Sequence, residues 1–567
     1  MSQNRIDNAA IAEIFEEMAF FMEVLGENSF KARGYANAAD VIEKAGTRLS
    51  AMETTELEAA LGKSFAGKVK QLLLPEGLKE YEELKTTIPH SVRQLKEVSG
   101  LGPKKVRLLW LDHQIDSLEK VLQACESGQL ATFSGFGEKT QASIAGSVVF
   151  VLENARKLRI NKSMALFEFW KQTLSNEFPE IQVEPGGELR RHANTVTQTD
   201  LVVSDDIQND IEAFLGKHEL LEYQAKISGP FVWKAFWDNT PHVIAFHFVD
   251  GTKFWKHWLL NTGSTAHLSW KYDQETSIEQ AAKKSKAESE EAFYAEVNLP
   301  FIPPELREGF AEMNLDSQGI ELLLTYEQLK GPLHNHSRWS DGVNTLEEMA
   351  MFCIAQGWEY FGIADHSQTA TYASGLEPHR VYAQHEEIDK LNAALAPFTI
   401  LKGIESDILS DGSLDYEKEI LSNFDYVVAS VHSTLSMNEA TATQRLVRAI
   451  ENPYTSILGH PTGRLLLKRE GYPLNMSKIL DACAANQVAI EINASPWRLD
   501  LDWHWVYKAI EKGIMISINP DAHKKESLID MTFGTMAGRK AGLKTSQTLN
   551  ALPLNELTLW LKNRERR

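Results

Sequence analysis

Short apolar runs alternate with longer amphipathic stretches from about residue 331 to the end of the chain. Between several of the runs the apolar positions recur with helical spacing, as in residues 343–356 and 476–486. This alternation predicts parallel strands joined by helical crossovers, closed as a barrel or a barrel-like sheet. The seven predicted strands are residues 331–334, 359–366, 398–405, 424–432, 455–460, 487–493 and 514–523.

Nine histidine and carboxylate residues lie at the ends of these predicted strands or in the loops that follow. In a barrel of this kind the chemistry lies at the C-terminal ends of the strands, so we expect the nine side chains to meet there. Clustered imidazole and carboxylate groups are typical ligands of Zn²⁺, Mn²⁺ or Fe²⁺ and suggest a hydrolytic centre with several ions. The predicted ligands are His334, His336, Asp341, His366, Glu405, His432, His460, Asp521 and His523.

Two glycine motifs, in residues 98–106 and 133–141, place Gly-x-Gly between predicted helices with lysines close behind. Such a turn leaves backbone N–H groups at a helix N-terminus able to hold a DNA phosphate, although an ordinary helix–turn–helix connection has the same pattern. Two similar copies favour contact with the DNA backbone, without base-sequence specificity, and residues 60–73 resemble an eroded third copy. The predicted DNA contacts are Gly100, Gly102, Lys104, Lys105, Gly135, Gly137 and Lys139.

The composition is that of a large soluble protein. A chain of 567 residues predicts three or more domains, and no apolar stretch is long enough for a membrane span. The polar start predicts no signal peptide, and three cysteines without a Cys-x-x-Cys pair favour the reducing cytoplasm. The net charge of −20 repels DNA, so DNA binding requires local basic or backbone-amide surfaces.

The motifs LHNHSRWSDG, ADHS, GIESDI, SVHS, GHPTGR and NPDAH resemble the metal-binding segments of the polymerase and histidinol phosphatase (PHP) family, with no ligand missing. The resemblance implies three divalent ions, Mn²⁺ or Zn²⁺ with Fe²⁺ as a further candidate. The first ion would be held by His334, His336, Glu405 and Asp521. Glu405 would bridge to a second, held by His432 and His460. The third would be held by Asp341, His366 and His523. The expected catalytic residues are Glu405, His336, Asp341 and, as a phosphate clamp, Arg464.

The preceding residues resemble bacterial family X DNA polymerases along their whole length. The resemblance is carried by residues 14–42, 99–110, 186–196, 261–267 and 299–309. It implies helical helix-hairpin-helix domains, an α+β nucleotidyltransferase-like palm and thumb, and a C-terminal α/β PHP barrel of seven strands, a distorted TIM-like barrel. The implied domains are a small gap-binding domain (1–82), fingers (83–150), palm (151–260), thumb (261–315), linker (316–330) and PHP domain (331–567).

The palm departs from the family pattern at its carboxylates. The family's Asp-x-Asp pair is here Gln198-Thr199-Asp200, and Ala245 stands where the third aspartate is expected. Glu188 replaces a serine near the expected nucleotide phosphates. Our hypothesis is that nucleotidyl transfer is lost or very weak, and that Mg²⁺ is not held there. The degenerate nucleotide-binding residues are Arg190, Arg191, Asp200, Gly263 and Ser264.

These features predict a cytoplasmic, monomeric DNA-repair phosphodiesterase. It would act at gapped, 3′-recessed or single-stranded DNA ends as a 3′–5′ exonuclease or end-cleaning enzyme, with cleavage at abasic sites as a further activity. Three alternatives remain: a bifunctional, active repair polymerase; a phosphomonoesterase of the histidinol-phosphatase type; and a DNA-end scaffold with structural metals.

Overall fold

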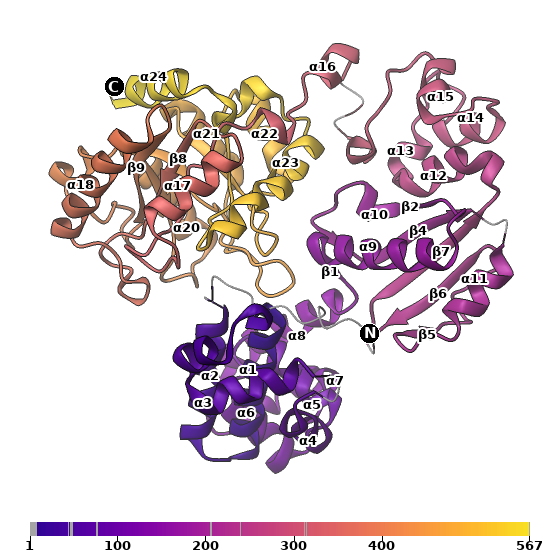
Figure 1. The fold of residues 1–567 in the computed structure, drawn as a ribbon, viewed down its shortest axis with the longest axis horizontal. Coiled ribbons are helices and arrows are strands. Elements are labelled where there is room, and N and C mark those ends of the chain that lie inside the picture. Colours follow the sequence, from indigo (N-terminus) through magenta and orange to yellow (C-terminus); the bar gives the residue numbers. More distant parts are fainter. Residues whose placement is uncertain are drawn as a thin grey trace. The chain divides into compact units, whose positions relative to one another are not determined.

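The computed structural model describes residues 8–43, 45, 49–74, 77–204, 207–238, 240–310, 312 and 315–565. The chain forms two compact units, residues 1–155 and 156–567. Figure 1 shows an all-helical N-terminal unit, whereas the second unit contains two separate groups of strands. Among the described residues, no helix combines the length and the apolar character that a membrane span needs.

The N-terminal unit is built around one apolar cluster that draws on all its longer helices. Both predicted glycine turns are present: Gly100 and Gly135 have φ values of 89° and 83°, a conformation that favours glycine. Helix α3 also leaves helical geometry at Gly62, within the segment that resembled an eroded third copy. The helices are α1 (Asn8–Leu25), α2 (Ser29–Glu43), α3 (Thr54–Leu72), α4 (Lys79–Thr87), α5 (His90–Gln94), α6 (Pro103–Arg107), α7 (Leu118–Glu126) and α8 (Glu138–Asn154).

The first part of the second unit contains a mixed five-stranded sheet in the order β2-β4-β7-β6-β5. The neighbouring strands β4 and β7 are parallel and pair Asp200 with Ala245, so the positions expected to carry catalytic carboxylates are adjacent. The strands are β2 (Val183–Pro185), β4 (Gln198–Ser204), β5 (Leu221–Tyr223), β6 (Val232–Trp237) and β7 (Val243–Val249), with β1 (Leu158–Arg159) and β3 (Thr195–Val196) forming a separate pair.

Helices pack around this sheet and continue into the helical segment for which the sequence predicts a thumb. Capping explains several of its starts, since the side chains of Ser264, Ser277 and Ser289 each accept a backbone N–H in the first turn of a helix. The helices of this part are α9 (Ile160–Glu177), α10 (Gly187–Arg190), α11 (Gln208–Leu215), α12 (Phe254–Thr262), α13 (Thr265–Ser269), α14 (Ile278–Lys284), α15 (Glu290–Glu296) and α16 (Ser317–Glu321).

The last part of the chain is a curled sheet of six parallel strands in sequential order. Side chains on these strands are buried on both faces, as expected for parallel strands covered by helices. Figure 1 shows β8 and β9 among the surrounding helices. The strands are β8 (Tyr360–Ile363), β9 (Thr399–Asp407), β10 (Tyr426–Ser430), β11 (Thr455–Leu458), β12 (Ala489–Asn493) and β13 (Ile516–Asn519).

The predicted strand at residues 331–334 is not a regular strand, yet its segment closes the sheet. Gly362 N–H donates to Pro332 O (2.8 Å) on one side, and His336 N–H donates to Ala522 O (2.9 Å) on the other. Pro332 has no N–H to give, which interrupts a regular ladder. The segment still carries His334 and His336 between the first and last strands of the barrel.

Four of the barrel helices among the described residues begin at a side chain that caps the first turn, namely those capped by Thr345, Asn438, Asn475 and Asp502. Thr345 forms a capping box at the start of α17, and Asn475 caps α21 at the start predicted from the sequence. The helices are α17 (Leu346–Ala355), α18 (Pro378–Leu395), α19 (Lys418–Leu421), α20 (Glu439–Ile450), α21 (Met476–Asn486), α22 (Trp503–Glu511), α23 (Met531–Lys540) and α24 (Leu554–Glu565).

Asp530, just before α23, makes the stability of the barrel depend on pH. Burial raises its pKa to about 7, with partial compensation by Lys524. The folded state therefore holds the carboxyl proton more tightly than the unfolded chain does, and stability falls as pH rises from the ordinary carboxyl range towards 7. We expect Asp530→Asn to raise the unfolding temperature more at pH 8 than at pH 5 in scanning calorimetry. An equal shift at both pH values would contradict this origin.

Candidate metal centre

The nine predicted ligands meet at the C-terminal end of the barrel strands. Glu405 belongs to β9, while the others lie just beyond strand ends or in the closing segment. Two of them occupy positive-φ backbone, His460 at 20° and Asp521 at 53°, a conformation non-glycine residues seldom adopt. Backbone of this kind is concentrated at functional sites, where the surrounding structure holds it in place.

Glu405 is the centre of the cluster and is only 1% exposed. Its Oε1 atom lies 3.0–3.1 Å from one nitrogen of each of three imidazoles, His334, His432 and His460. Its Oε2 atom lies 2.9 Å from His366 Nδ1. One carboxylate thus faces imidazoles from four separate segments of the barrel.

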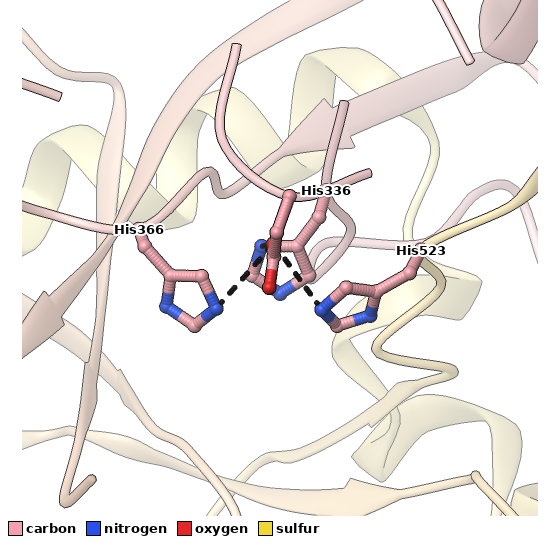
Figure 2. Close-up of side chains that lie close together, drawn as sticks. His336, His366 and His523 are labelled. Carbon is pink, nitrogen blue, oxygen red and sulfur yellow. Dashed lines mark ion pairs between the residues drawn. The ribbon is translucent and has the colours of Figure 1, made fainter. Parts of the chain in front are cut away.

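Asp341 forms a second focus, towards which three further imidazole nitrogens point. Its Oδ1 lies 3.4 Å from His523 Nε2, 3.7 Å from His366 Nε2 and 3.9 Å from His336 Nδ1. Figure 2 shows the rings of His336, His366 and His523 surrounding one small space. His366 therefore faces both carboxylates, one with each ring nitrogen.

Asp521 completes the cluster from the loop after β13. Its Oδ1 accepts a hydrogen bond from His336 (2.9 Å) and lies 3.8 Å from His334. Its second oxygen accepts a hydrogen bond from Asn493 Nδ2 at 3.0 Å. Asn493 thereby fixes the orientation of this carboxylate.

The donor set fits divalent cations. Several buried nitrogen and oxygen atoms of the cluster lie close to one another but do not meet hydrogen-bond geometry with any described residue, an expensive arrangement unless a cation satisfies them. These atoms are His334 Nε2, His336 Nδ1, His366 Nδ1, Glu405 Oε2 and His460 Nδ1. In each of four overlapping groups of three or four ligands, the ligand atoms all lie within 4.8 Å of one another.

These groups divide the ligands differently from the partition that the family resemblance implies. His336 lies with Asp341, His366 and His523, in addition to its place beside His334 and Asp521. His432 and His460 fall into different groups, which share Glu405. The assignment of each ligand to a particular ion therefore stays a prediction.

Burial and close packing shift the pKa values of the cluster strongly. Burial disfavours the charged form of every group, but His432, His334 and His366 outweigh it at Glu405 and hold its pKa well below the usual value. Burial, then the neighbouring His523 and His366, lowers the pKa of His336 to about 3. His336 therefore has the neutral form that metal ligation requires, whereas the facing carboxylates outweigh burial and raise the pKa of His432 to about 10 and that of His523 to about 9. An ion bound by those two imidazoles would displace a proton from each.

Two buried carboxylates orient ligand histidines from behind. Glu491 Oε2 lies 2.8 Å from His334 Nδ1, and Asp407 Oδ1 lies 2.5 Å from His432 Nδ1. A carboxylate on the far nitrogen fixes the tautomer and orientation of a ligand imidazole. Sequence analysis missed both residues, although an ionisable residue inside the apolar run 487–493 is an unusual feature that points to Glu491.

Replacing Glu491 is expected to weaken metal binding without removing a ligand. Mutation of a residue that hydrogen-bonds to a metal ligand typically costs roughly 10- to 100-fold in metal affinity or activity. We therefore expect Glu491→Gln to raise the Kd for Mn²⁺ by about that factor. Isothermal titration of the metal-free protein measures the change. Glu347→Gln, at an exposed helix position remote from these contacts, serves as the control. Equal Kd values for Glu491→Gln and the control would contradict an orienting role.

Arg464, predicted to clamp a phosphate, is bonded to the protein itself. Its guanidinium donates to the carbonyl oxygens of Arg498 (3.0 Å) and Leu499 and to Asp502 Oδ2 (3.1 Å). Arg464 therefore holds the loop after β12 in place. That loop carries Arg498, whose Nε lies 3.7 Å from Asp521 Oδ2. The cationic side chain beside the cluster is thus Arg498, which sequence analysis did not single out.

The arginines expected to bind nucleotide are taken up by internal ion pairs. Arg190 makes a two-pronged pair with Glu290 (2.8 Å for each bond), which Arg307 also contacts. Arg191 donates to Glu308 (2.9 Å) and to the carbonyl of Thr262 (2.7 Å). Both arginines thus hold the palm-like sheet to the helices that follow it.

Ser264 and Gly263, also expected to bind nucleotide, lie at the start of a helix. The Ser264 side chain caps α13 by accepting the His267 N–H at 3.1 Å. Packing is tight at Gly263, where an added Cβ would lie 2.8 Å from the side chain of Leu268. These contacts give both residues a structural role.

Asp200, the remaining carboxylate of the expected palm site, is occupied by hydrogen bonds to neighbouring side chains. Gln198 donates to Asp200 Oδ1 (2.6 Å), and His247 Nε2 lies 2.6 Å from the same oxygen. Lys234 donates to the other end of the Gln198 amide (2.9 Å). An added Cβ on Gly187 would lie 2.2 Å from Asp200 Oδ2, so the second oxygen is crowded as well.

The predicted DNA contacts stand at the two glycine turns of the N-terminal unit. Gly102 and Gly137 are the N-cap residues of α6 and α8, directly before the first helical N–H groups. Lys105 turns back to the carbonyl of Gly100 (3.0 Å), whereas Lys104 and Lys139 are both exposed. Contact of these residues with DNA remains a prediction.

Comparison with known proteins matches both ends of the chain. A helix-hairpin-helix domain model matches residues 6–74, and a PHP domain model matches residues 332–495. A probable phosphatase of Thermoanaerobacter sp. is 27% identical over 41% of this chain and 95% of its own length. A probable phosphatase of Shewanella halifaxensis is 26% identical over 39% of this chain and 88% of its own length.

One relative matches almost end to end. The DNA polymerase/3′-5′ exonuclease PolX of Bacillus subtilis is 32% identical over 98% of this chain and 99% of its own length. The helix-hairpin-helix match precedes the PHP match along the chain. The chain therefore belongs to the PolX family, the family X DNA polymerases that carry a C-terminal PHP domain.

Proposed function

We propose that this protein is a metal-dependent phosphodiesterase that removes nucleotides from DNA 3′ ends. The observation that carries the proposal is the convergence of four imidazoles on Glu405, with the carboxylates of Asp341 and Asp521 beside them. Family membership supports a metal-dependent hydrolase, and the helix-hairpin-helix match supports DNA as the polymer it holds.

We call the cluster of the nine predicted ligands the cage. Divalent ions bound in it would screen the phosphodiester charge and supply an activated water for attack on phosphorus. The protein's own contribution is to hold the donors in place. Glu491 and Asp407 fix the imidazoles from behind, while Asn493 fixes Asp521. Hydrolysis adds water across the P–O bond, leaving a 3′-hydroxyl on the shortened strand and a phosphate on the released nucleotide.

Arg498 is the residue that we propose to orient the scissile phosphate. Its guanidinium lies beside Asp521, and its loop is fixed by Arg464. A guanidinium fork matches two phosphate oxygens, so it adds direction as well as charge. Asp341 and His336 remain proposed ligands that place an ion near the same phosphate.

We further propose that the palm no longer transfers nucleotides. Three features support this: Gln198 and Ala245 replace two of the three carboxylates, Asp200 is engaged by His247, and both arginines are in internal ion pairs. Two Mg²⁺ ions require several oxygen ligands at close range, which one engaged carboxylate does not supply. Under this proposal the palm and thumb serve as a platform for DNA.

The second candidate function is a phosphomonoesterase, favoured by the probable phosphatases that match the barrel. The same cage can hydrolyse a monoester. Cleavage at abasic sites is a further proposed activity of the exonuclease and needs the same ligands.

One assay separates these functions. The full-length protein is incubated with Mn²⁺ and either a 3′-labelled single-stranded oligodeoxynucleotide or a small phosphomonoester. Release of the terminal nucleotide, lost on chelation, supports the nuclease, and an internal abasic analogue in the same strand reports abasic cleavage. Turnover of the monoester alone would replace the nuclease with the phosphatase.

A further inference from the structure

We propose that Tyr372 is a stacking platform for the base of the 3′-terminal nucleotide, an inference that rests on the proposed nuclease function. The Tyr372 side chain is 70% exposed although it is large and aromatic. Its ring centroid lies 6.2 Å from that of His366, which contacts both carboxylate centres of the cage. An aromatic ring is thus presented to solvent directly beside the metal ligands.

The loop that presents Tyr372 is held firmly from both sides. The residues flanking Tyr372 anchor it, since Ala370 and Ala373 are 0% and 1% exposed. Thr369 donates its N–H to Asp415 (2.8 Å) and its hydroxyl to Asp407 (3.1 Å), the carboxylate that orients His432. The ring position is therefore coupled to the same framework that fixes the ligands.

The far end of the loop is fixed as well. Arg380 of α18 donates to the carbonyls of Ser374 (2.6 Å) and Trp339, and so ties this loop to the one that carries Asp341. Gly375 packs so closely that an added Cβ would lie 1.9 Å from Ser367 O. The exposure of Tyr372 is thus a property of a fixed loop, and its ring is pre-positioned for a ligand.

The chemistry of the exposed ring points to a nucleobase. Every base has a flat π face, and stacking on an aromatic side chain is tolerant of base identity, which suits an enzyme that shortens any sequence. We therefore assign Tyr372 to substrate positioning.

A second exposed aromatic residue, Trp497, is already stacked. Trp497, next to Arg498, is 48% exposed, but the guanidinium of Arg159 lies 3.1 Å from its ring centroid. A base could reach that face of the ring only by displacing Arg159. Tyr372 is therefore the better placed of the two for the terminal base.

The test removes the ring from the enzyme and the base from the substrate. Wild type, Tyr372→Ala, Tyr372→Trp and Tyr382→Ala are assayed with Mn²⁺ on two single-stranded oligodeoxynucleotides. One ends in an ordinary 3′ nucleotide and the other in a tetrahydrofuran abasic analogue. Tyr382 is an exposed tyrosine of α18 (46%) and provides the matched control.

Stacking on one aromatic side chain corresponds to roughly a 5- to 150-fold effect. We expect Tyr372→Ala to lower kcat/KM on the ordinary end by about that factor, chiefly through KM, and to change the abasic end less than twofold. Tyr372→Trp should retain the activity, and Tyr382→Ala should match wild type on both substrates.

The outcomes separate this inference from the proposed function. An equal loss on both ends, or no loss on the ordinary end, overturns the stacking role while the nuclease stands. If wild type shortens neither oligodeoxynucleotide, the proposed nuclease function itself fails, and the stacking role fails with it.

Discussion

Glu405→Ala is expected to lower phosphodiester hydrolysis by roughly 10³-fold or more, the scale of losing a preorganised charged group at a reacting centre. Glu405 faces His334, His366, His432 and His460, so its removal leaves four imidazoles without their shared carboxylate. Nucleotide release from a 3′-labelled strand measures the loss. Glu405→Gln keeps the shape but loses the charge, and we expect it to be nearly as inactive.

The control is Asp200→Ala, which removes a buried carboxylate from the palm of the same unit. It should leave hydrolysis within twofold of wild type. Circular dichroism and the unfolding temperature verify that each variant is folded. Retention of a tenth or more of the activity by folded Glu405→Ala would contradict its central position.

Chelation of divalent ions is expected to destabilise the barrel strongly. Buried polar atoms of the cluster make no well-aligned hydrogen bond among the described residues, so ions bound there would satisfy groups that are otherwise costly to bury. An ion at 100 times its Kd adds about 2.7 kcal/mol to the unfolding free energy of the state that binds it. Scanning calorimetry with chelator, then with Mn²⁺ restored, measures the shift.

Glu405→Ala provides the matched sample for that measurement. Because the variant lacks the shared carboxylate, Mn²⁺ should raise its unfolding temperature much less than that of wild type. An equal response to Mn²⁺ in both proteins would place the stabilising ions elsewhere on the chain.

The convergence of the nine side chains could be predicted because residue type and position in the pattern agreed. Histidines and carboxylates that end apolar runs lie at one end of a parallel barrel, whatever the details of the strands. The segment 331–334 shows the limit, since Pro332 prevents a regular strand while the backbone still closes the sheet. The ligand positions survive that error because they depend only on which segment lies between β8 and β13.

Long-range partners could not be predicted in this way. Arg190 and Arg191 bond to Glu290 and Glu308, which are 100 and 117 residues distant, and no local pattern announces such pairs. Arg464 and Arg498 are both arginines near the cluster, but their side chains point to different partners. The Arg464 guanidinium donates to backbone carbonyls, whereas the Arg498 guanidinium lies beside Asp521. The spacing of residues along the sequence identifies which residues lie near a site. Which way each side chain points, and therefore which partner it contacts, can be seen only in the structure.

The central claim is that the barrel site is the active one and that the palm site is not. The most direct test incubates wild type, Glu405→Ala and Asp200→Ala with 3′-recessed DNA and Mn²⁺, first without and then with dNTPs. We predict shortening by wild type and Asp200→Ala, none by Glu405→Ala, and no extension by any of the three. Extension of the recessed end by wild type that Asp200→Ala abolishes would contradict the claim.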